Sequence, residues 1–346
     1  MENQPGNLGT VPRVAIIGCG RIGSWFDEED DSGRVLSHAG AYKKSGAVRL
    51  VALCDIDRKR LQECGLRRGV RALYEDYRAL LKEEEIDILS VCTPVDRRFA
   101  VLEAAFRAGI KVVFCEKPVV STLEEALRAN EAAYRNGSTV VVNYFRRWDP
   151  GIGQVARIIK EGRIGRVQSV TCYYNKGILN NGSHGIDLLN LFWGLPFRVR
   201  TLRVIDDGYD DLDRTMDCVF EYETESSGFS AYLIGSDWRH FSIFELDVIG
   251  SGGRVRLTEK GQEIQLSTVG ADSIFPGYSI LKNPEVITTN FECGLLDVIQ
   301  DLVDIWRGGS PETKSGIEET IDVLRVIEAL RESMNSGYSP VNLKEN

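Results

Sequence analysis

The sequence is poor in the residues that mark metal centres and disulfide frameworks. Three histidines in 346 residues argue against a histidine-rich metal centre, so we predict no metal. The eight cysteines form no Cys-x-x-Cys pair. Cys54, Cys92 and Cys115 lie within or just after strand-like runs, which indicates buried thiols in a reducing compartment and not a disulfide framework.

An excess of basic residues and long apolar runs are also missing. The net charge of −9 argues against non-specific binding to nucleic acids. No apolar run approaches the length that crosses a membrane, and residues 1–6 lack the basic and apolar regions of a signal peptide. We therefore expect a cytoplasmic protein with no nucleic-acid or membrane partner.

Length and pattern predict an α/β protein with two domains of different type. The chain exceeds what one hydrophobic core usually supports. In its first half, strand-like and helix-like segments alternate, as in a doubly wound parallel sheet. From Arg198 to Val269, strands follow one another with little helix, which predicts an α+β domain with a mostly antiparallel sheet. We place the domains at residues 1–122 and 123–346, and the helices predicted at 290–306 and 317–333 could fold back on the first domain.

The stretch from Val112 to Pro118 is where we place the chemistry. Residues 112–115 suit a strand buried on both faces, and Pro118 ends it. Glu116 and Lys117 then lie at the carboxyl end of a buried strand, where open α/β sheets bind their ligands. A partly desolvated lysine there can exchange protons near neutral pH. Alternatively, Lys117 only neutralises Glu116 at the rim of the sheet.

A glycine-rich turn follows the first predicted strand. Residues 11–17 are nearly all apolar and lead into Gly18-Cys19-Gly20-Arg21-Ile22-Gly23, a G-x-G-x-x-G sequence. Gly18 permits the tight turn, Gly20 lets the backbone approach a pyrophosphate, and Gly23 allows helix and strand to pack closely. The pyrophosphate would lie on the N-terminus of a helix. We therefore predict that this turn, including Arg21 and Ile22, binds a dinucleotide.

Asp55 ends the second predicted strand, residues 49–54. Its carboxylate can accept hydrogen bonds from the adenosine ribose and repel a 2′-phosphate, which favours NAD over NADP. The alternative is a plain aspartate at a strand end. Asp55 lies 32 positions after Gly23, against about 20 in the usual motif. We interpret the acidic stretch 27–33 as a solvated surface loop inserted there, and His38 behind it as structural.

These motifs together resemble those of one family. The glycine turn, Asp55, Thr93-Pro94 and Glu116-Lys117-Pro118 occur in the order found in the glucose–fructose oxidoreductase/inositol dehydrogenase/rhizopine catabolism (Gfo/Idh/MocA) oxidoreductase family. The chain looks like a member over essentially its whole length. The resemblance implies an N-terminal Rossmann domain that binds NAD, with Thr93, Pro94 and Glu116 lining the nicotinamide side. Members commonly have an Asn two positions after the Thr and a His further on, where this chain has Val95 and Arg98.

The resemblance continues after the first domain. Residues 143–150 are similar to the family's linker, and Asn143 and Arg146 are candidate substrate contacts. Arg146 and Arg147 could recognise a phosphate, carboxylate or sugar, or could form an interdomain salt-bridge cluster, which we favour slightly.

His184 and Asn180 are the predicted site residues of the second domain. His184 would lie in the first turn of a helix, where the helix dipole disfavours a charged imidazole. A neutral imidazole suits a general base, although a lone histidine is more often structural. The family has an Asp four residues before this His, whereas this chain has Asn180, which can position a hydroxyl group but carries no charge. Asp187, on the same helix face, would orient His184 or cap the helix.

Together these observations predict reversible hydride transfer between NAD(H) and a secondary alcohol or ketone of a sugar, inositol or related polyol. The site would lie between the domains, where Lys117 orients or protonates the reacting oxygen, His184 relays the proton and Asn180 positions the substrate. The alternative from another class is a non-catalytic NAD-binding sensor. A further enzymatic alternative uses tightly held NAD within one turnover or in a redox-assisted elimination.

An oligomer is also expected. An antiparallel sheet needs cover on its open face, and Trp238, Phe241 and Phe244 suggest that a second subunit supplies it. We predict a homodimer or homotetramer formed through the C-terminal sheet.

Overall fold

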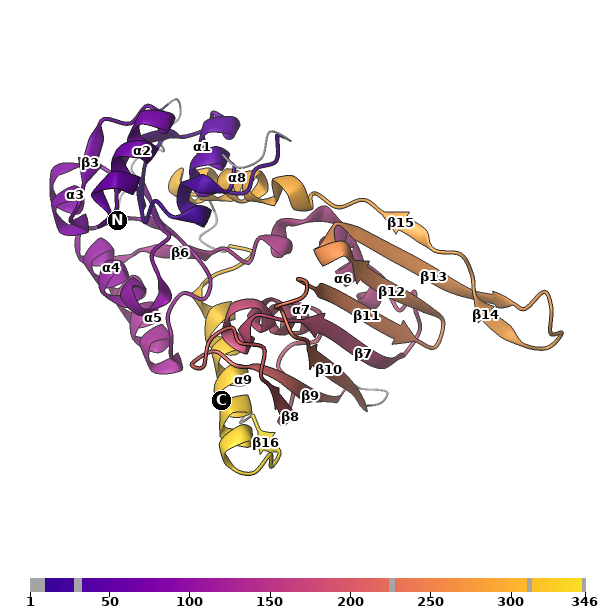
Figure 1. Ribbon diagram of the computed structural model, residues 1–346. Helices are drawn as coiled ribbons and strands as arrows, with labels where there is room; N and C mark the ends of the chain where they lie inside the picture. The colour runs from indigo at the N-terminus through magenta and orange to yellow at the C-terminus, as the bar shows by residue number, and fades with distance from the viewer. Residues whose placement is uncertain (1–9, 28–32, 224–227, 310–312, 344–346) are drawn as a thin grey trace. The chain divides into compact units, whose positions relative to one another are not determined.

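A computed structural model describes residues 10–27, 33–223, 228–309 and 313–343 (Figure 1). The chain forms two compact units. The first runs up to Trp148 and includes Glu292–Ile321, and the second comprises Asp149–Phe291 and the chain from Asp322 onward. This division differs from the predicted boundary at residue 122, because α5 (Leu123–Asn136) and β6 (Thr139–Val142) belong to the first unit and β6 completes its sheet.

The first unit contains a six-stranded sheet in the order β3-β2-β1-β4-β5-β6, and every neighbouring pair is parallel. Besides β6, its strands are β1 (Arg13–Ile17), β2 (Arg49–Cys54), β3 (Ala72–Tyr74), β4 (Ile88–Val91) and β5 (Val112–Cys115). Strands β1, β4 and β5 are buried on both faces apart from Arg13, as their apolar sequences predicted. The strand order reverses between β1 and β4, which is the point where doubly wound sheets bind their ligands. The Rossmann prediction is therefore confirmed.

Several helices belong to the first unit, and most of them connect these strands. They are the π-helical turn η1 (Arg21–Trp25), α1 (His38–Ser45), α2 (Arg58–Arg68), α3 (Tyr77–Glu83), α4 (Val95–Arg107), α5, the short η2 (Phe145–Trp148) and, from the later segment, α8 (Gly294–Trp306). Helix α5 is capped by Thr122, whose side chain accepts a hydrogen bond from the N–H of Glu125 at 3.2 Å. The apolar stripe of α8 packs into the hydrophobic core of the first unit: Leu295, Val298, Ile299 and Leu302.

The second unit is built on a ten-stranded sheet in the order β14-β13-β12-β11-β7-β10-β9-β8-β16, with β15 paired to β13. Only the pairing of β7 with β10 is parallel among the described strands, so the mostly antiparallel sheet was predicted correctly. The strands are β7 (Val167–Tyr174), β8 (Arg198–Ile205), β9 (Thr215–Glu223), β10 (Gly228–Gly235), β11 (Phe244–Gly250), β12 (Gly253–Thr258), β13 (Glu263–Ala271), β14 (Ser279–Leu281), β15 (Glu285–Ile287) and β16 (Val341–Asn342).

Burial alternates along these strands, so one face of the sheet is covered and the other is partly open. The remaining elements are α6 (Pro150–Lys160), the π-helical η3 (Gly177–Gly182), α7 (Ser183–Trp193), the short η4 (Glu259–Gly261) and η5 (Phe291–Cys293), and α9 (Ile317–Asn335). Helix α7 approaches the sheet closely at Gly185, where a Cβ atom would lie 2.8 Å from Leu233 and 3.0 Å from Cys172. Its neighbour His184 is thereby held at the sheet.

Two expectations from the sequence change. Phe244 is 4% exposed and lies inside the second unit, so it needs no second subunit to cover it, whereas Phe241 is exposed. The predicted helix at residues 290–306 begins only at Gly294, and it belongs to the first unit. Among the described residues, no helix has the length and apolar character needed to cross a membrane.

Candidate active site

Five residues that follow strands of the first unit lie along the carboxyl edge of its parallel sheet. Each is held there by a backbone hydrogen bond to a neighbouring strand or strand end. In each case a backbone N–H donates to a backbone carbonyl oxygen. The pairs are Gly18 with Cys54, Cys92 with Ile17, Glu116 with Val91 and Asn143 with Cys115, at 2.8–3.0 Å, and Asp55 with Tyr74 at 3.1 Å. The sequence-predicted residues of this unit therefore lie along one edge, as the topology of a parallel sheet requires.

The glycine turn has the shape that close approach of a ligand demands. Gly18 has a φ of +99°, and a Cβ atom there would lie 2.6 Å from the carbonyl carbon of Cys92. A Cβ on Gly23 would lie 2.0 Å from the carbonyl oxygen of Gly18. A Cβ on Gly20 would meet no atom within 4 Å, so open space lies beside this glycine. That space fits the approach of a pyrophosphate to the backbone.

The helix expected after the glycine turn is only one π-helical turn, η1. It closes with the N–H of Ser24 donating to Gly20 at 2.9 Å. Asp27 then leaves the turn and accepts a hydrogen bond from the N–H of Ser37 at 3.0 Å, and it lies 3.7 Å from the guanidinium of Arg68. Asp27 therefore bonds to Ser37, the residue that caps α1, and is not part of a solvated loop, which corrects the prediction for this residue. The rest of the predicted acidic loop, residues 28–32, lies outside the described part of the chain.

Asp55 is bonded to the glycine turn itself. Its Oδ2 accepts from the N–H of Cys19 and its Oδ1 from the N–H of Asp57, both at 2.8 Å. The guanidinium of Arg60 lies 3.4 Å from Oδ1 and 3.5 Å from Oδ2. The carboxylate is 6% exposed, so it links the end of β2 to the turn after β1.

Thr93 and Asn143 bring unsatisfied polar atoms to the same edge. Within the described residues, the Thr93 hydroxyl and the Asn143 Oδ1 are buried and have no hydrogen-bond partner. Buried polar atoms are costly when unpaired, so both are suited to bond a ligand. Together with the space beside Gly20 and the carboxylate of Asp55, they fit a bound dinucleotide.

Glu116 lies in a buried polar cluster beneath Lys117. Its Oε1 accepts from Asn143 Nδ2 at 2.5 Å and is 3.1 Å from His38 Nε2, and its Oε2 accepts from the N–H of Lys117 at 3.2 Å. Burial raises the pKa of Glu116, but the hydrogen bonds from His38 and Asn143 and the guanidinium of Arg98 outweigh it and lower this pKa overall. Lys117 itself is half-buried.

Arg98, which replaces a His of the family pattern, holds the loops around Lys117. Its Nε donates to the carbonyl oxygen of Thr93 and one terminal nitrogen donates to that of Glu116, both at 2.8 Å, and the same nitrogen donates to the carbonyl of Pro118. Arg98 is 7% exposed. The departure from the family pattern therefore has a structural role that the sequence reasoning did not find.

Arg146 and Arg147 have separate surroundings. The Arg146 guanidinium lies over the ring of Phe145, 5.0 Å from its centroid, and the residue is buried. Arg147 donates to the carbonyl of Lys314 at 3.2 Å and lies 3.8 Å from Glu319. Arg147 thus pairs within the first unit, whereas the sequence interpretation was an interdomain cluster.

In the second unit, Asn180 and His184 follow each other on η3 and α7. Asn180 Nδ2 donates to the hydroxyl of Tyr209 at 2.9 Å. His184 is 9% exposed, with its ring edge-on to Phe244 at a centroid distance of 6.1 Å. Because η3 runs directly into α7, His184 lies within continuous helical backbone and not at a free helix N-terminus, which weakens the argument from the helix dipole. Asp187 is buried one turn further along.

Asp213 supports this segment and was missed from the sequence. Its carboxylate oxygens accept from the N–H groups of Leu179 at 2.7 Å and Asn180 at 2.9 Å. Burial raises the pKa of Asp213, and the two backbone hydrogen bonds only partly oppose this. A Cβ on Gly177, at a φ of +78°, would lie 2.2 Å from this carboxylate. The acidic run from Asp206 to Asp213 was a signal that could have drawn attention to it.

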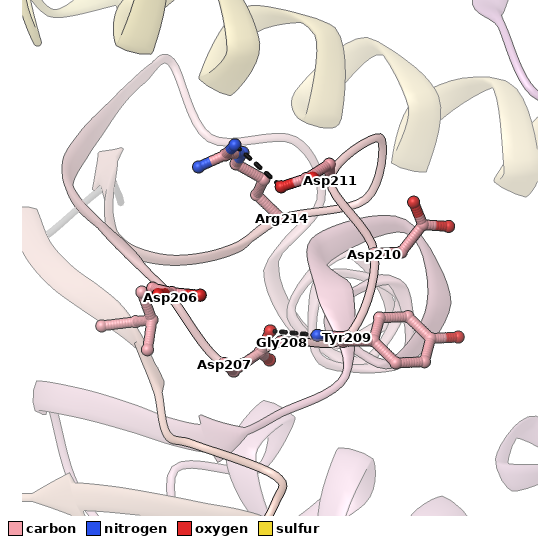
Figure 2. A pocket seen from close by; sticks show the side chains of 8 residues that line it. Asp206, Asp207, Gly208, Tyr209, Asp210, Asp211 and Arg214 are labelled. Carbon is pink, nitrogen blue, oxygen red and sulfur yellow. Dashed lines mark hydrogen bonds and ion pairs between the residues drawn. The ribbon is translucent and has the colours of Figure 1, made fainter.

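An acidic cavity lies beside Asp213 in the second unit (Figure 2). Residues 205–211 and Arg214 line it. The N–H of Tyr209 donates to Asp207 at 3.1 Å and Arg214 pairs with Asp211 at 3.0 Å, so the loop is held by its own side chains. Within the described residues, no group of three or more His, Cys, Asp or Glu side chains could hold a metal ion.

Comparison with known proteins relates the chain to dehydrogenases. Residues 12–144 match the model of an oxidoreductase family with an NAD-binding Rossmann fold. D-apiose dehydrogenase from Paraburkholderia graminis is 33% identical over 158 residues, which cover 45% of this chain and 39% of that protein. Inositol 2-dehydrogenase from Salmonella typhimurium is 32% identical over 156 residues, covering 44% and 43%. The chain thus spans about two fifths of the length of these relatives.

Solved structures extend the likeness in fold to the whole chain. An inositol dehydrogenase homologue from Azotobacter vinelandii, complexed with NADH and myo-inositol, has a TM-score of 0.76 and 21% identity, with 97% of this chain and 98% of that chain covered. An oxidoreductase from Agrobacterium radiobacter, in complex with NAD+, L-tartaric acid and magnesium, has a TM-score of 0.71 and 20% identity, covering 96% and 98%. Residues 12–144 therefore match the NAD-binding Rossmann domain of this oxidoreductase family, and the solved structures relate the fold of the whole chain to theirs.

Proposed function

We propose that this protein catalyses the reversible oxidation of a secondary alcohol in a sugar, inositol or related polyol, with NAD as the redox partner. The observation that carries the proposal is the edge of the first unit's sheet, where the open space beside Gly20, the Asp55 carboxylate and Lys117 above buried Glu116 occur together. The named activities of the two relatives, on D-apiose and inositol, support a carbohydrate or polyol substrate.

The first unit supplies the groups that would hold NAD. The turn from Gly18 to Gly23 would bind the pyrophosphate and Asp55 the adenosine ribose, while Thr93, Pro94 and Glu116 would border the nicotinamide. Arg21 and Ile22 belong to the same turn. When bound there, NAD would supply the acceptor for the hydride of the oxidised carbon, and NADH the donor in the reverse direction.

The proton of the reacting hydroxyl needs an acceptor as its carbon becomes a ketone. We assign this role to Lys117, which orients the oxygen and takes the proton, and we assign to His184 the relay of that proton towards solvent. Asn180 and Asn143 would hydrogen-bond neighbouring hydroxyl groups of the substrate. In the reverse direction the same groups return the proton to the carbonyl oxygen.

Replacement of Lys117 by Met tests the proposal. We expect a fall of about 10²–10⁴-fold in kcat, because general acid–base catalysis typically contributes this much. The measurement is the absorbance of reduced nicotinamide across a panel of sugars, sugar phosphates, nucleotide sugars and inositols. Lys111→Met is the matched control, since Lys111 is exposed and precedes the opposite end of the same strand β5.

Two outcomes would contradict the proposal. One is full turnover by Lys117→Met on the substrate that the wild type prefers. The other is tight NADH binding by the wild type with no turnover on any alcohol of the panel, which would favour a sensor.

We also propose that a homo-oligomer forms through the second unit's sheet and that the protein works in the cytoplasm. Apolar side chains are exposed on this unit, among them Tyr173, Ile249 and Phe275. The described residues include all eight cysteines and none of them forms a disulfide, which suits a reducing compartment. Light scattering after size-exclusion chromatography tests the homo-oligomer, and a monomer at micromolar concentration would exclude it. Cell fractionation tests the cytoplasmic location.

A further inference from the structure

A continuous row of buried polar groups leads from α1 to Lys117. The hydroxyl of Tyr42 lies 2.5 Å from Ser90 Oγ, Ser90 Oγ lies 2.8 Å from His38 Nδ1, and His38 Nε2 lies 3.1 Å from Glu116 Oε1. Glu116 then accepts the N–H of Lys117. Tyr42, Ser90 and His38 are at most 1% exposed and Glu116 is 5% exposed, so water does not compete for these bonds.

Counting donors and acceptors sets the direction of this row. An ionised carboxylate can only accept hydrogen bonds, so His38 must carry its hydrogen on Nε2. In a neutral His38, Nδ1 then accepts from the hydroxyl of Ser90, and Ser90 in turn accepts from the hydroxyl of Tyr42. Every hydroxyl and N–H in the row then has one acceptor. The ring of His38 is held in this orientation by stacking on Phe114, with centroids 4.3 Å apart and planes at 26°.

The groups that face Glu116 come from every element around it. They are His38 and, through Ser90, Tyr42 on α1, Cys92 after β4, Arg98 on α4, Cys115 on β5 and Asn143 after β6. Burial raises the pKa of the Cys92 thiol well above its usual value and that of Cys115 to about 12, so both thiols are neutral near pH 7. Burial likewise raises the pKa of Tyr42.

Glu116 has no direct ion pair with Arg98. The hydrogen bonds found for the Arg98 guanidinium go to three backbone carbonyl oxygens, and those that Glu116 accepts come from His38, Asn143 and the N–H of Lys117. The negative charge of Glu116 is therefore favoured by its hydrogen bonds, with His38 first among the donors, and by the nearby charge of Arg98, which makes no direct contact with the carboxylate. Lys117 is the next residue along the chain. A nearby negative charge favours the protonated form of a lysine.

We propose that His38 is a positioning residue for Lys117: its Nε2–H keeps Glu116 ionised, and the charge of Glu116 sets the pH at which Lys117 gives up its proton. This inference rests on the role of Lys117 in the proposed function, but it concerns the titration of the lysine, which can be measured without a substrate. His38, which the sequence analysis interpreted as structural, thereby acquires a role in the chemistry.

Variants of His38 separate its two ring nitrogens. In His38→Gln the amide nitrogen can take the place of Nε2 and still donate to Glu116. In His38→Asn the shorter side chain reaches only the place of Nδ1, so Glu116 loses this donor. Glu116→Gln removes the charge and keeps the shape. His240→Asn is the matched control, because the side chain of His240 is 74% exposed and lies in the second unit.

The readout is the titration of Lys117 in the full-length protein, followed by NMR after reductive methylation with ¹³C and assigned by the signal missing in Lys117→Arg. We expect Glu116→Gln to move the titration of Lys117 about one unit to lower pH, because a neighbouring negative charge is lost. His38→Asn should move it in the same direction by less, because Glu116 loses one of the groups that favour its ionised form. His38→Gln and His240→Asn should titrate like the wild type. The pH profile of kcat/KM should move in the same direction, which a merely structural defect would not cause.

A second measurement uses the wild type alone, in case His38→Asn does not fold. With three histidines in the chain, ¹⁵N-labelled imidazoles give few signals, and His184→Asn and His240→Asn assign them. We expect His38 to carry hydrogen on Nε2. An unprotonated Nε2, or an unchanged Lys117 titration in Glu116→Gln, would overturn the inference. Absence of turnover with a shifted lysine titration would instead contradict the proposed function and leave the role of His38 intact.

Discussion

Asp55 shows how one carboxylate couples the nucleotide-binding turn to the rest of the sheet. It accepts the N–H of Cys19 inside the G-x-G-x-x-G turn and lies beside the guanidinium of Arg60. The sequence reasoning assigned Asp55 to the ribose of NAD. The structure adds that the residue also holds the turn, so its loss should affect both the affinity for the cofactor and the choice between cofactors.

Asp55→Asn should weaken NADH binding by about 10- to 100-fold, because a hydrogen bond to a charged acceptor is worth about 1.5–3 kcal/mol. It should also raise the affinity for NADPH, since Arg60 loses its neighbouring carboxylate and becomes available to a 2′-phosphate. Fluorescence titration of both reduced cofactors measures the change. In the double variant Asp55→Asn/Arg60→Gln the gain in NADPH affinity should disappear. Unchanged NADH affinity in the single variant would contradict this account.

At the scale of elements, two glycines of the G-x-G-x-x-G turn, Gly20 and Gly23, have different roles. A Cβ atom on Gly23 would overlap the carbonyl of Gly18, whereas one on Gly20 would point into open space. Gly23 is thus required by the fold and Gly20 by the ligand.

Gly20→Ala should therefore fold with nearly wild-type stability and bind NADH at least about tenfold more weakly, because the methyl group occupies the space for the pyrophosphate. Gly23→Ala should lose about 3 kcal/mol of stability or more through overlap with backbone. Urea unfolding and NADH titration on both variants test the pair. Equal loss of stability in the two variants would show that the turn does not divide its glycines in this way.

The π-helical segment η3 depends on a carboxylate from another part of the chain. Asp213→Asn replaces one of two acceptor oxygens by a donor, so one N–H of residues 179 and 180 is left unpaired. We expect a loss of about 1–3 kcal/mol in the free energy of unfolding, the cost of an unsatisfied buried group. Asp211→Asn is the control, because its side chain is 94% exposed and should change stability by less than about 0.5 kcal/mol. Equal stability of the two variants in urea would contradict the role of Asp213.

At the scale of the whole molecule, the buried polar cluster makes stability depend on pH. The pKa of Glu116 is lowered from 4.5 in the folded state, so its ionised form is favoured by folding. Its contribution is present in full above pH 4.5 and is lost as the pH falls below 4.5 towards the folded-state pKa.

We therefore expect the wild type to exceed Glu116→Gln in stability by about 2 kcal/mol at pH 7. This difference should shrink as the pH falls from 4.5 towards 3. Urea denaturation at a series of pH values measures it. A constant difference across this range would mean that Glu116 is not ionised in the folded protein.

Much of the fold follows from local patterns. The apolar runs of β1, β4 and β5, the cap at Thr122 and the glycine at residue 137 that ends α5 are each determined within a few residues. The strands of the second unit were recognisable from alternation and turns. The boundaries between the two units were less predictable. The first unit includes α5, β6 and α8, because β6 pairs with the edge of its sheet and the apolar face of α8 packs into its core, far from α8 in the sequence.

The sequence by itself determined the Rossmann domain and the candidates Gly18, Asp55, Lys117 and His184, since each candidate lies in a short motif whose chemistry depends on its neighbours along the chain. Only the tertiary structure decided what supports them. Ser90 lies on β4 and Glu116, 26 residues later, directly follows the adjacent strand β5, while His38 comes from a helix after the first strand and Arg98 bridges two loops. Hydrogen bonds between such distant residues are set by the parallel register of the sheet, which no local pattern records.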